Sequence, residues 1–148
     1  MVRQNDYYDV IIAGGGTAGC ACAYIAGKLG LSVLLVEKNI HLGGTMTSAL
    51  VIPGMHTSKS QINTEFFDAL NSELLKIHGE ITYEDNPAWY NPELLKIALD
   101  RLMAKAGVDV LFNADLSSVS IINNEIKTCI LSAEMLSVPI AASYIVDA

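Results

Sequence analysis

The sequence Tyr8-Asp9-Val10-Ile11-Ile12-Ala13-Gly14-Gly15-Gly16-Thr17-Ala18-Gly19 decides the fold class of this chain. Residues 8–13 are mostly apolar and β-branched, which is typical of a central parallel strand covered on both faces. The glycines end this strand, and residues 18–29 are rich in small residues that predict a helix. Gly30 ends the helix, and residues 32–37 form a second apolar run. The sequence therefore predicts a strand–helix–strand unit with a right-handed crossover.

Three of these glycines have the spacing of a dinucleotide-binding turn. Gly14 permits a sharp turn, and Gly16 lets backbone N–H groups approach a pyrophosphate without a Cβ in the way. Gly19 lets the helix pack closely against the strand. The helix N-terminus would supply the N–H groups and the dipole that bind the phosphates. Because the glycines have a strand before them and a helix and second strand after them, the motif indicates a nucleotide site rather than an ordinary tight turn.

Glu37 ends the second apolar run, where an acidic side chain can accept hydrogen bonds from ribose hydroxyls. Its negative charge would repel a ribose 2′-phosphate, so an NADP-type ligand is disfavoured. FAD and NAD both remain open, since each presents an ADP moiety to the same unit.

The rest of the chain predicts further elements of the same fold class. They are a long loop at 41–59, a helix from Ile62 to about His78, a helix from Pro92 to Gly107 capped by Asn91, a strand at 108–112, a hairpin of 119–122 and 126–131 around Asn123-Asn124, and a last strand at 144–148. Tyr83, Trp89 and Tyr90 surround Pro87, which favours a packed loop over a lid. We expect an α/β fold: a Rossmann-like parallel sheet with helices on both faces and a β-hairpin or meander insertion before the last strand.

Composition points to one soluble globular domain. The chain has 148 residues and 51% of them are hydrophobic, enough for a core without metal or disulfide support. The 9 basic and 16 acidic residues give a net charge of −7, which disfavours nucleic acid as a partner. Three cysteines cannot all pair within the chain, so we expect reduced thiols and a cytoplasmic protein. Glycines interrupt the longest uncharged run, residues 10–27, and residues 1–9 lack the basic region of a secretory signal, so no membrane span or targeting segment is expected.

Three stretches of the chain resemble a known family. Residues 10–19, Val36-Glu37-Lys38 and residues 42–48 are similar to the N-terminus of bacterial FAD-dependent oxidoreductases of the glutathione-reductase-like flavoprotein superfamily. Residues 91–95 and 106–108 resemble the helix and the following strand of the same family. The resemblance covers nearly the whole chain and is most specific in its N-terminal third.

The resemblance implies FAD as the cofactor and assigns residues to its parts. The pyrophosphate would contact Gly14, Gly15, Gly16, Thr17, Ala18 and Gly19; the adenosine ribose Glu37 and Lys38; the ribityl chain and flavin Gly43, Gly44, Thr45 and Met46; and the adenine the backbone of Leu116. Paired glycines such as Gly43 and Gly44 suit this role physically, because they expose backbone N–H groups to a flat ligand.

No residue can be assigned to catalysis from the sequence. His56 lies in the long loop, where it could act as an acid or base near the flavin, although such a histidine is more often an ordinary loop residue. Cys20 and Cys22 follow the glycines on the predicted helix and are interpreted as small packing residues rather than a redox pair. Together with Cys129 they have no zinc-site spacing, so no metal is expected.

We therefore expect residues 1–148 to be the N-terminal portion of an FAD- or dinucleotide-binding domain, truncated at its last strand. Similar proteins continue with a Thr-Gly turn and a substrate domain, so the expected partner is a missing C-terminal half or a second polypeptide that supplies it. The expected function is the FAD-binding portion of an oxidoreductase that passes hydride or electrons between a small organic substrate and FAD. The alternatives are a non-catalytic NAD- or dinucleotide-binding module and an inactive fragment of a larger flavoprotein.

Overall fold

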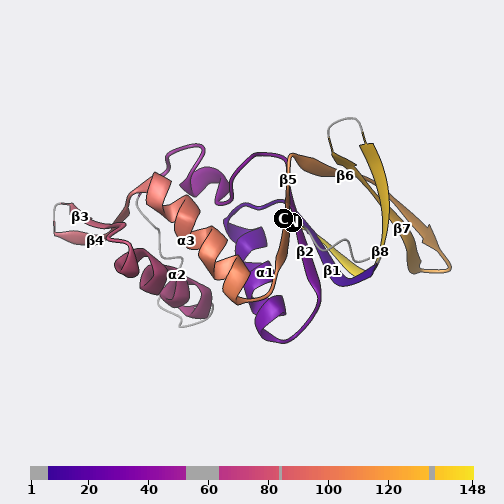
Figure 1. Cartoon of the computed structure of the whole chain (residues 1–148), viewed down its shortest axis with the longest axis horizontal. Coiled ribbons are helices and arrows are strands. Elements are labelled where there is room, and N and C mark those ends of the chain that lie inside the picture. Colours follow the sequence, from indigo (N-terminus) through magenta and orange to yellow (C-terminus); the bar gives the residue numbers. More distant parts are fainter. Residues whose placement is uncertain (1–6, 53–63, 84, 134–135) are drawn as a thin grey trace.

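The computed structural model describes residues 7–52, 64–83, 85–133 and 136–148 (Figure 1). The helices in these ranges are α1 (Thr17–Lys28), the short 3-10 helix η1 (Gly44–Met46), α2 (Thr64–Lys76) and α3 (Pro92–Lys105). The strands are β1 (Tyr7–Ala13), β2 (Val33–Glu37), β3 (Glu80–Tyr83), β4 (Asn86–Tyr90), β5 (Asp109–Phe112), β6 (Ala114–Ile122), β7 (Glu125–Ala133) and β8 (Leu136–Asp147).

One sheet carries the fold, with the strand order β5-β2-β1-β8-β7-β6. Strand β1 pairs in parallel with β2 on one side and with β8 on the other, and β2 pairs in parallel with β5. The strands β6, β7 and β8 form an antiparallel meander. Strand β8 belongs to both parts, because residues 136–140 pair with β7 and residues 141–147 pair with β1. The predicted fold class, an α/β protein with a Rossmann-like parallel sheet and a meander insertion, is confirmed.

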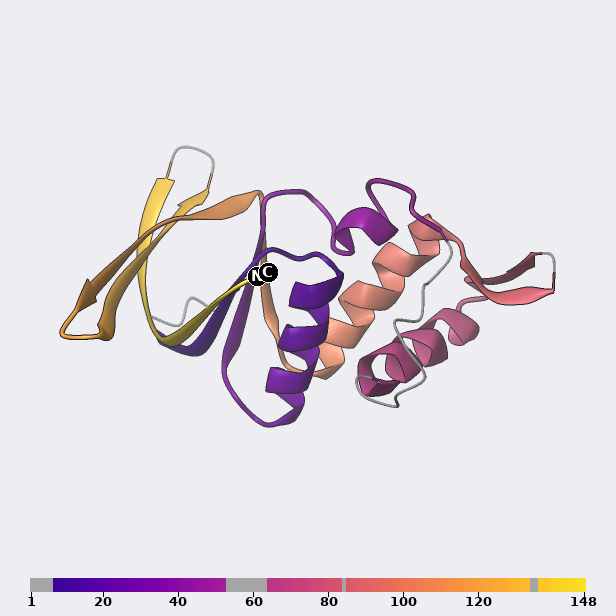
Figure 2. The same cartoon turned by 180° about the vertical axis from the view of Figure 1, so that it is seen from behind.

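The two faces of the parallel strands have different covers (Figures 1 and 2). Val10 and Ile12 of β1 pack into a core with α1, α2 and α3, whereas Ile11 packs into a second core with the meander. Successive side chains of a strand point to opposite faces, so the apolar run in β1 supplies both cores. The sequence predicted helices on both faces. In the described residues the helices lie on one face, because buried residues of β7 and β8 such as Leu131 cover the other.

The local signals in the sequence correspond to real caps and turns. Asn91 caps α3, and its side-chain oxygen accepts the backbone N–H of Glu93 at 2.9 Å. Asn123 and Asn124 both have positive φ, 53° and 61°, at the predicted hairpin between β6 and β7. The predictions of a helix starting at Pro92 and of a hairpin at these asparagines are therefore confirmed.

A second hairpin, β3–β4, was not predicted. Tyr83 and Trp89, which the sequence placed in a packed loop, face each other from its two strands with ring centroids 5.0 Å apart. Figure 1 shows this hairpin at the end of the molecule opposite the meander. Proline is normally confined to edge strands, so Pro87 argued against a strand at this place in the sequence. Both strands of a two-stranded hairpin are edge strands, so the hairpin can contain the proline.

Candidate functional site

The turn after β1 and the first part of α1 contain two positions where any side chain would collide with backbone. Gly14 has a φ of +107°, and a Cβ there would lie 2.2 Å from the carbonyl oxygen of Ala148. A Cβ on Gly19 would lie 1.9 Å from the carbonyl oxygen of Gly14. Heavy atoms do not approach this closely, so α1 packs against the turn only because position 19 is glycine, and Ala148 lies beside the turn only because position 14 is glycine.

Gly16 differs from these two glycines because the space beside it is open. It is the N-cap of α1 with a φ of −68°, and a Cβ added there would meet no atom within 4 Å. The N–H groups in the first turn of an α-helix have no partners inside the helix. In α1 this turn begins at Thr17 and continues with Ala18. Such groups attract anions, so this opening suits a phosphate.

The second glycine pair lies directly against the first turn. The Gly43 N–H donates to the carbonyl oxygen of Gly15 at 2.8 Å. A Cβ on Gly44 would lie 3.0 Å from the Cα of Gly16, and both Gly43 and Gly44 have positive φ, +104° and +53°. At Gly16 and Gly44 the two glycine loops therefore meet backbone to backbone.

Glu37 lies at the end of β2 beneath these loops and is only 5% exposed. Its Oε2 accepts the Gly15 N–H at 2.7 Å. Its Oε1 accepts both the backbone N–H and the side-chain amide of Asn39, each at 2.7 Å. The carboxylate thus connects the first glycine loop to the turn after β2 and stabilises both, whatever it contacts on a ligand.

A cavity of about 340 Å³ opens beside the loops, at the carboxyl ends of β1, β2 and β8. Ligands of open α/β sheets bind outside the carboxyl ends of the strands, which is where this cavity lies. The lining includes five residues predicted from the sequence: Gly14, Gly16, Glu37, Lys38 and Gly44. Ligand pockets range over roughly 300–1,000 Å³, so a cavity of this size would hold only part of a dinucleotide.

The cavity also has lining residues that the sequence did not predict. They are Ala13, Val36, Asn39, Ala114, Asp115, Asp147 and Ala148. Asp115 lies at the start of β6, and Asp147 lies at the end of β8. These two positions are far apart in the sequence. The general rule that sites form at the carboxyl ends of parallel strands could have identified both positions, since each follows or ends such a strand.

The other predicted cofactor residues do not line this cavity. Gly15 and Gly43 join the two loops through the hydrogen bond described above. Thr17, Ala18 and Gly19 belong to α1, and Thr45 and Met46 to η1. Leu116 pairs with Leu131 in the meander, while Ala114 and Asp115 line the cavity in its place. Contacts of these residues with a cofactor stay predictions.

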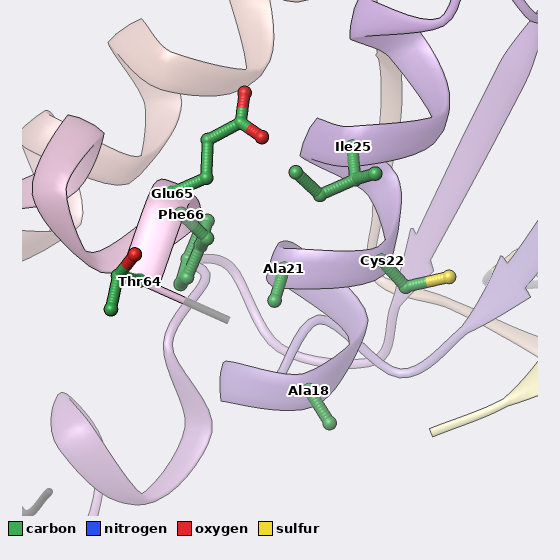
Figure 3. Close-up of a pocket in the computed structure, with 7 residues that line it drawn as sticks. All are labelled: Ala18, Ala21, Cys22, Ile25, Thr64, Glu65 and Phe66. Atoms are coloured by element: carbon green, nitrogen blue, oxygen red, sulfur yellow. The ribbon is translucent and has the colours of Figure 1, made fainter. Parts of the chain in front are cut away.

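A larger cavity of about 790 Å³ lies between α1 and the start of α2 (Figure 3). Its lining includes Ala18, Ala21 and Ile25 from α1, and Phe66 from α2. None of the glycine turn at 14–16 and no part of β2 lines it. Although this cavity is larger, the glycine turn, Glu37 and the second glycine pair do not line it, so we take the smaller cavity as the candidate site.

The cysteines on α1 do not form a redox pair in this structure. Burial raises the pKa of the Cys20 thiol to about 12, and the opposing influence of the Gly43 N–H on that pKa is smaller. A thiol with such a pKa stays protonated and unreactive at neutral pH. Cys22 and Cys129 are also free thiols, and no cluster of metal-binding side chains occurs within the described ranges. His56, the candidate acid or base, lies outside the described residues.

One further titratable pair lies near the second glycine loop. The Nδ1 of His41 is buried and has no hydrogen-bond partner among the residues that the structure describes. Burial raises the pKa of Asp100 on α3, and the nearby His41 opposes that rise. Neither residue lines the smaller cavity.

The comparison with known families identifies the family of the chain. The family model described as FAD dependent oxidoreductase matches residues 9–148, which is nearly the whole chain. The chain belongs to the FAD-dependent oxidoreductase family. The glycine turn, Glu37 and the second glycine pair all lie within the matched range.

Curated relatives match the chain over shorter stretches than the family model does. Vinyl phenol reductase of Lactiplantibacillus plantarum is 39% identical over 76 residues, which are 49% of this chain and 15% of that protein. NADH oxidase of Thermoanaerobacter brockii is 40% identical over 72 residues, 49% of this chain and 10% of that protein. Digeranylgeranylglycerophospholipid reductase 2 of Methanothermobacter thermautotrophicus is 56% identical over 36 residues, 24% of this chain and 9% of that protein. The chain thus spans only a small share of the length of these relatives.

Solved structures show the same fold over almost the entire chain. L-proline dehydrogenase from P. horikoshii matches with a TM-score of 0.67 and 14% identity, covering 95% of this chain and 52% of that one. THI4 of Thermovibrio ammonificans matches with a TM-score of 0.63 and 19% identity, covering 97% and 57%. Identities this low establish the fold alone. Within the described ranges, no helix has the length and apolar character needed to cross a membrane.

Proposed function

We propose that residues 1–148 form an FAD-binding domain and that this domain is the cofactor-binding portion of an oxidoreductase of the glutathione-reductase-like superfamily. The observation that carries the proposal is the meeting of two glycine loops beside the cavity at the carboxyl ends of β1 and β2. At Gly16 the backbone is open to a ligand, and at Gly14 and Gly44 the chain adopts positive φ beside the same cavity.

The residues at the cavity would bind and orient the cofactor. The first turn of α1 and the backbone at Gly16 would bind the pyrophosphate, since they present N–H groups and the positive end of the helix dipole. Glu37 and Lys38 would lie beside the adenosine ribose. Thr45 and Met46 in η1 would approach the flavin, and the backbone near Leu116 the adenine. When bound, FAD supplies the exchange of hydride or electrons with a small organic substrate.

The charges around the cavity favour FAD over a phosphorylated ribose. Glu37, Asp115 and Asp147 line it together with one basic residue, Lys38. A ribose 2′-phosphate would bring further negative charge next to these carboxylates, which disfavours NADP. NAD remains the alternative ligand, as expected for a non-catalytic module.

The test is a titration of the purified chain with FAD, NAD and NADP, each followed by calorimetry and by the shift of the melting temperature. We expect FAD to bind most tightly and to raise the melting temperature, because a ligand that binds only the folded state stabilises it. The matched variant is Gly16→Ala, whose added methyl group has free space in the protein but would lie where the pyrophosphate approaches.

We expect Gly16→Ala to leave the melting temperature of the free protein nearly unchanged and to weaken FAD binding by about tenfold or more. If NAD bound tighter than FAD, the chain would instead be an NAD-binding module. If the variant bound FAD as tightly as the original chain, the pyrophosphate would not lie at this turn.

A further inference from the structure

Both backbone hydrogen-bonding groups of Gly15 have partners within the protein. Its N–H donates to Glu37, and its carbonyl oxygen accepts two donors: the Gly43 N–H at 2.8 Å and the Cys20 thiol at 3.2 Å. Gly15 therefore has no free hydrogen-bonding group of its own to offer a ligand. Its contacts instead connect β2, α1 and the second glycine loop at one point.

Cys20 lies at the centre of this arrangement. It is fully buried in the second turn of α1, and its sulfur faces both the Gly15 carbonyl and the Gly43 N–H. Burial keeps the thiol protonated, so the sulfur can donate its hydrogen to the Gly15 carbonyl at neutral pH. An alanine here would leave the same backbone geometry in α1 but no donor.

We propose that Cys20 is a positioning residue of the candidate cofactor site, because its thiol and the Gly43 N–H share the Gly15 carbonyl and so set the distance between the two glycine loops. The proposal rests on the proposed function in one respect, namely that the loops it positions are those that would bind FAD.

The residues that follow Gly15 and Gly43 in the chain line the cavity. Gly16 follows Gly15 in the chain, and Gly44 follows Gly43. Both line the cavity, and the clearance between them is so small that a Cβ on Gly44 would lie 3.0 Å from the Gly16 Cα. A small displacement of the Gly43 loop would therefore change the width of the cavity where a phosphate would enter. Ligand-binding backbone is effective only when it is held in place before the ligand arrives.

A second buried cysteine provides a matched control. Cys129 on β7 is also fully buried, but it belongs to the core between the sheet and the meander. Cys20→Ala and Cys129→Ala each remove one buried sulfur, so both should lower the melting temperature by similar amounts. Only Cys20→Ala should increase the hydrogen exchange rate of the Gly43 amide and weaken FAD binding, the latter by about fivefold for one lost hydrogen bond.

Two further variants separate the hydrogen bond from the volume of the side chain. Cys20→Ser keeps a donor in a smaller group, and Cys20→Val fills the space without a donor. We expect slow Gly43 exchange in the original chain and in Cys20→Ser, and faster exchange in Cys20→Val and Cys20→Ala. The valine variant keeps the comparison decisive if the alanine variant does not fold.

The outcomes distinguish this proposal from the proposed function. If no variant nor the original chain binds FAD, but Gly43 exchange increases only in Cys20→Ala and Cys20→Val, the proposed function fails and the positioning role stands. If Cys20→Ala and Cys129→Ala have the same Gly43 exchange rate and the same FAD affinity, the positioning role is wrong. The positioning role is also wrong if the Gly43 amide exchanges at the same rate in Cys20→Ser and in Cys20→Val.

Discussion

The Oε2 atom of Glu37 accepts the backbone N–H of Gly15 at 2.7 Å, so an acid predicted to contact a ribose also holds the turn that would bind the pyrophosphate. Its other oxygen is engaged by two N–H groups of Asn39. A carboxylate can accept about four hydrogen bonds, and three of these positions are taken by donors of the protein. One position is left for a ribose hydroxyl. Glu37 thus has a structural role that is independent of any ligand.

The first prediction is that Glu37→Gln destabilises the protein without a ligand. Both carboxylate oxygens accept N–H groups, and the NH₂ of glutamine would have to face one of these donors. We expect a loss of about 1–3 kcal/mol in the free energy of unfolding, measured by urea denaturation. Glu125→Gln, at an exposed carboxylate, should change it by less than about 0.5 kcal/mol. Equal stability of both variants would mean that Glu37 acts on a ligand alone.

The second prediction compares two glycines of the same turn. Gly19→Ala should destabilise the fold by about 1–3 kcal/mol or more, because its methyl group would lie 1.9 Å from the Gly14 carbonyl oxygen. Gly16→Ala should change the stability by less than about 0.5 kcal/mol, because the space beside it is open and its φ is negative. Thermal unfolding of the two variants checks this order. A Gly19→Ala protein as stable as Gly16→Ala would contradict the close packing of α1 on the turn.

Much of this turn could be predicted from the sequence because its constraints are local. Gly14 is required by its own positive φ, Gly19 by its contact with Gly14 five residues earlier, and the cap at Asn91 is similarly local. The cavity lining at Asp115 and Asp147 arises where the ends of separate strands meet, so only the general rule on the carboxyl ends of parallel strands, and no neighbouring residue, could have indicated it. The bond from Cys20 to Gly15 was missed for another reason: it depends on how α1 is oriented, which spacing alone does not give.

The strands that were missed or shortened also have physical explanations. The sequence predicted the last strand only over 144–148, whereas β8 begins at Leu136. Its first part contains Pro139, which removes a ladder donor and argues against a strand by pattern alone. Pairing with β7 forms that part of β8, so tertiary contacts outweigh the local signal.

The third prediction concerns pH. Glu73 on α2 contacts Lys105 on α3 at 2.5 Å and Lys76 at 2.7 Å, and these hydrogen bonds lower the pKa of its carboxyl. A carboxyl with a lowered pKa stabilises the folded state above its unfolded pKa of about 4.5, and this contribution is lost as the pH falls through the folded value. We expect the stability difference between the original chain and Glu73→Gln to be largest at neutral pH and to vanish in acid. Urea denaturation across that range measures it.

Glu93→Gln is the control for this experiment. Glu93 forms a similar pair with Lys96 on α3, but its side chain is largely exposed. Exposed pairs contribute little, so the pH dependence of this variant should match that of the original chain. A Glu73→Gln protein that also retained the original pH profile would show that the contact between α2 and α3 does not depend on the charge.

The fourth prediction concerns the turn between β6 and β7. Asn124 has a φ of 61°, a conformation in which glycine is unstrained and β-branched residues are disfavoured. Asn124→Gly should therefore keep or raise the melting temperature, and Asn124→Val should lower the stability by about 1–2 kcal/mol. Circular dichroism during heating would give both values, and a valine variant as stable as the glycine variant would contradict the hairpin geometry.

The junction of Gly14 with Ala148 has a consequence for the order of folding. The Ala148 N–H donates to the Ala13 carbonyl at 2.9 Å, and Ala148 lines the cavity next to Gly14. Contacts between residues so distant in the sequence close large loops and form slowly. On a translating ribosome the glycine turn emerges early, yet the wall beside it stays incomplete until the end of β8 has left the exit tunnel. The cavity is therefore completed only after β8 has been made, even though its most recognisable motif is made first.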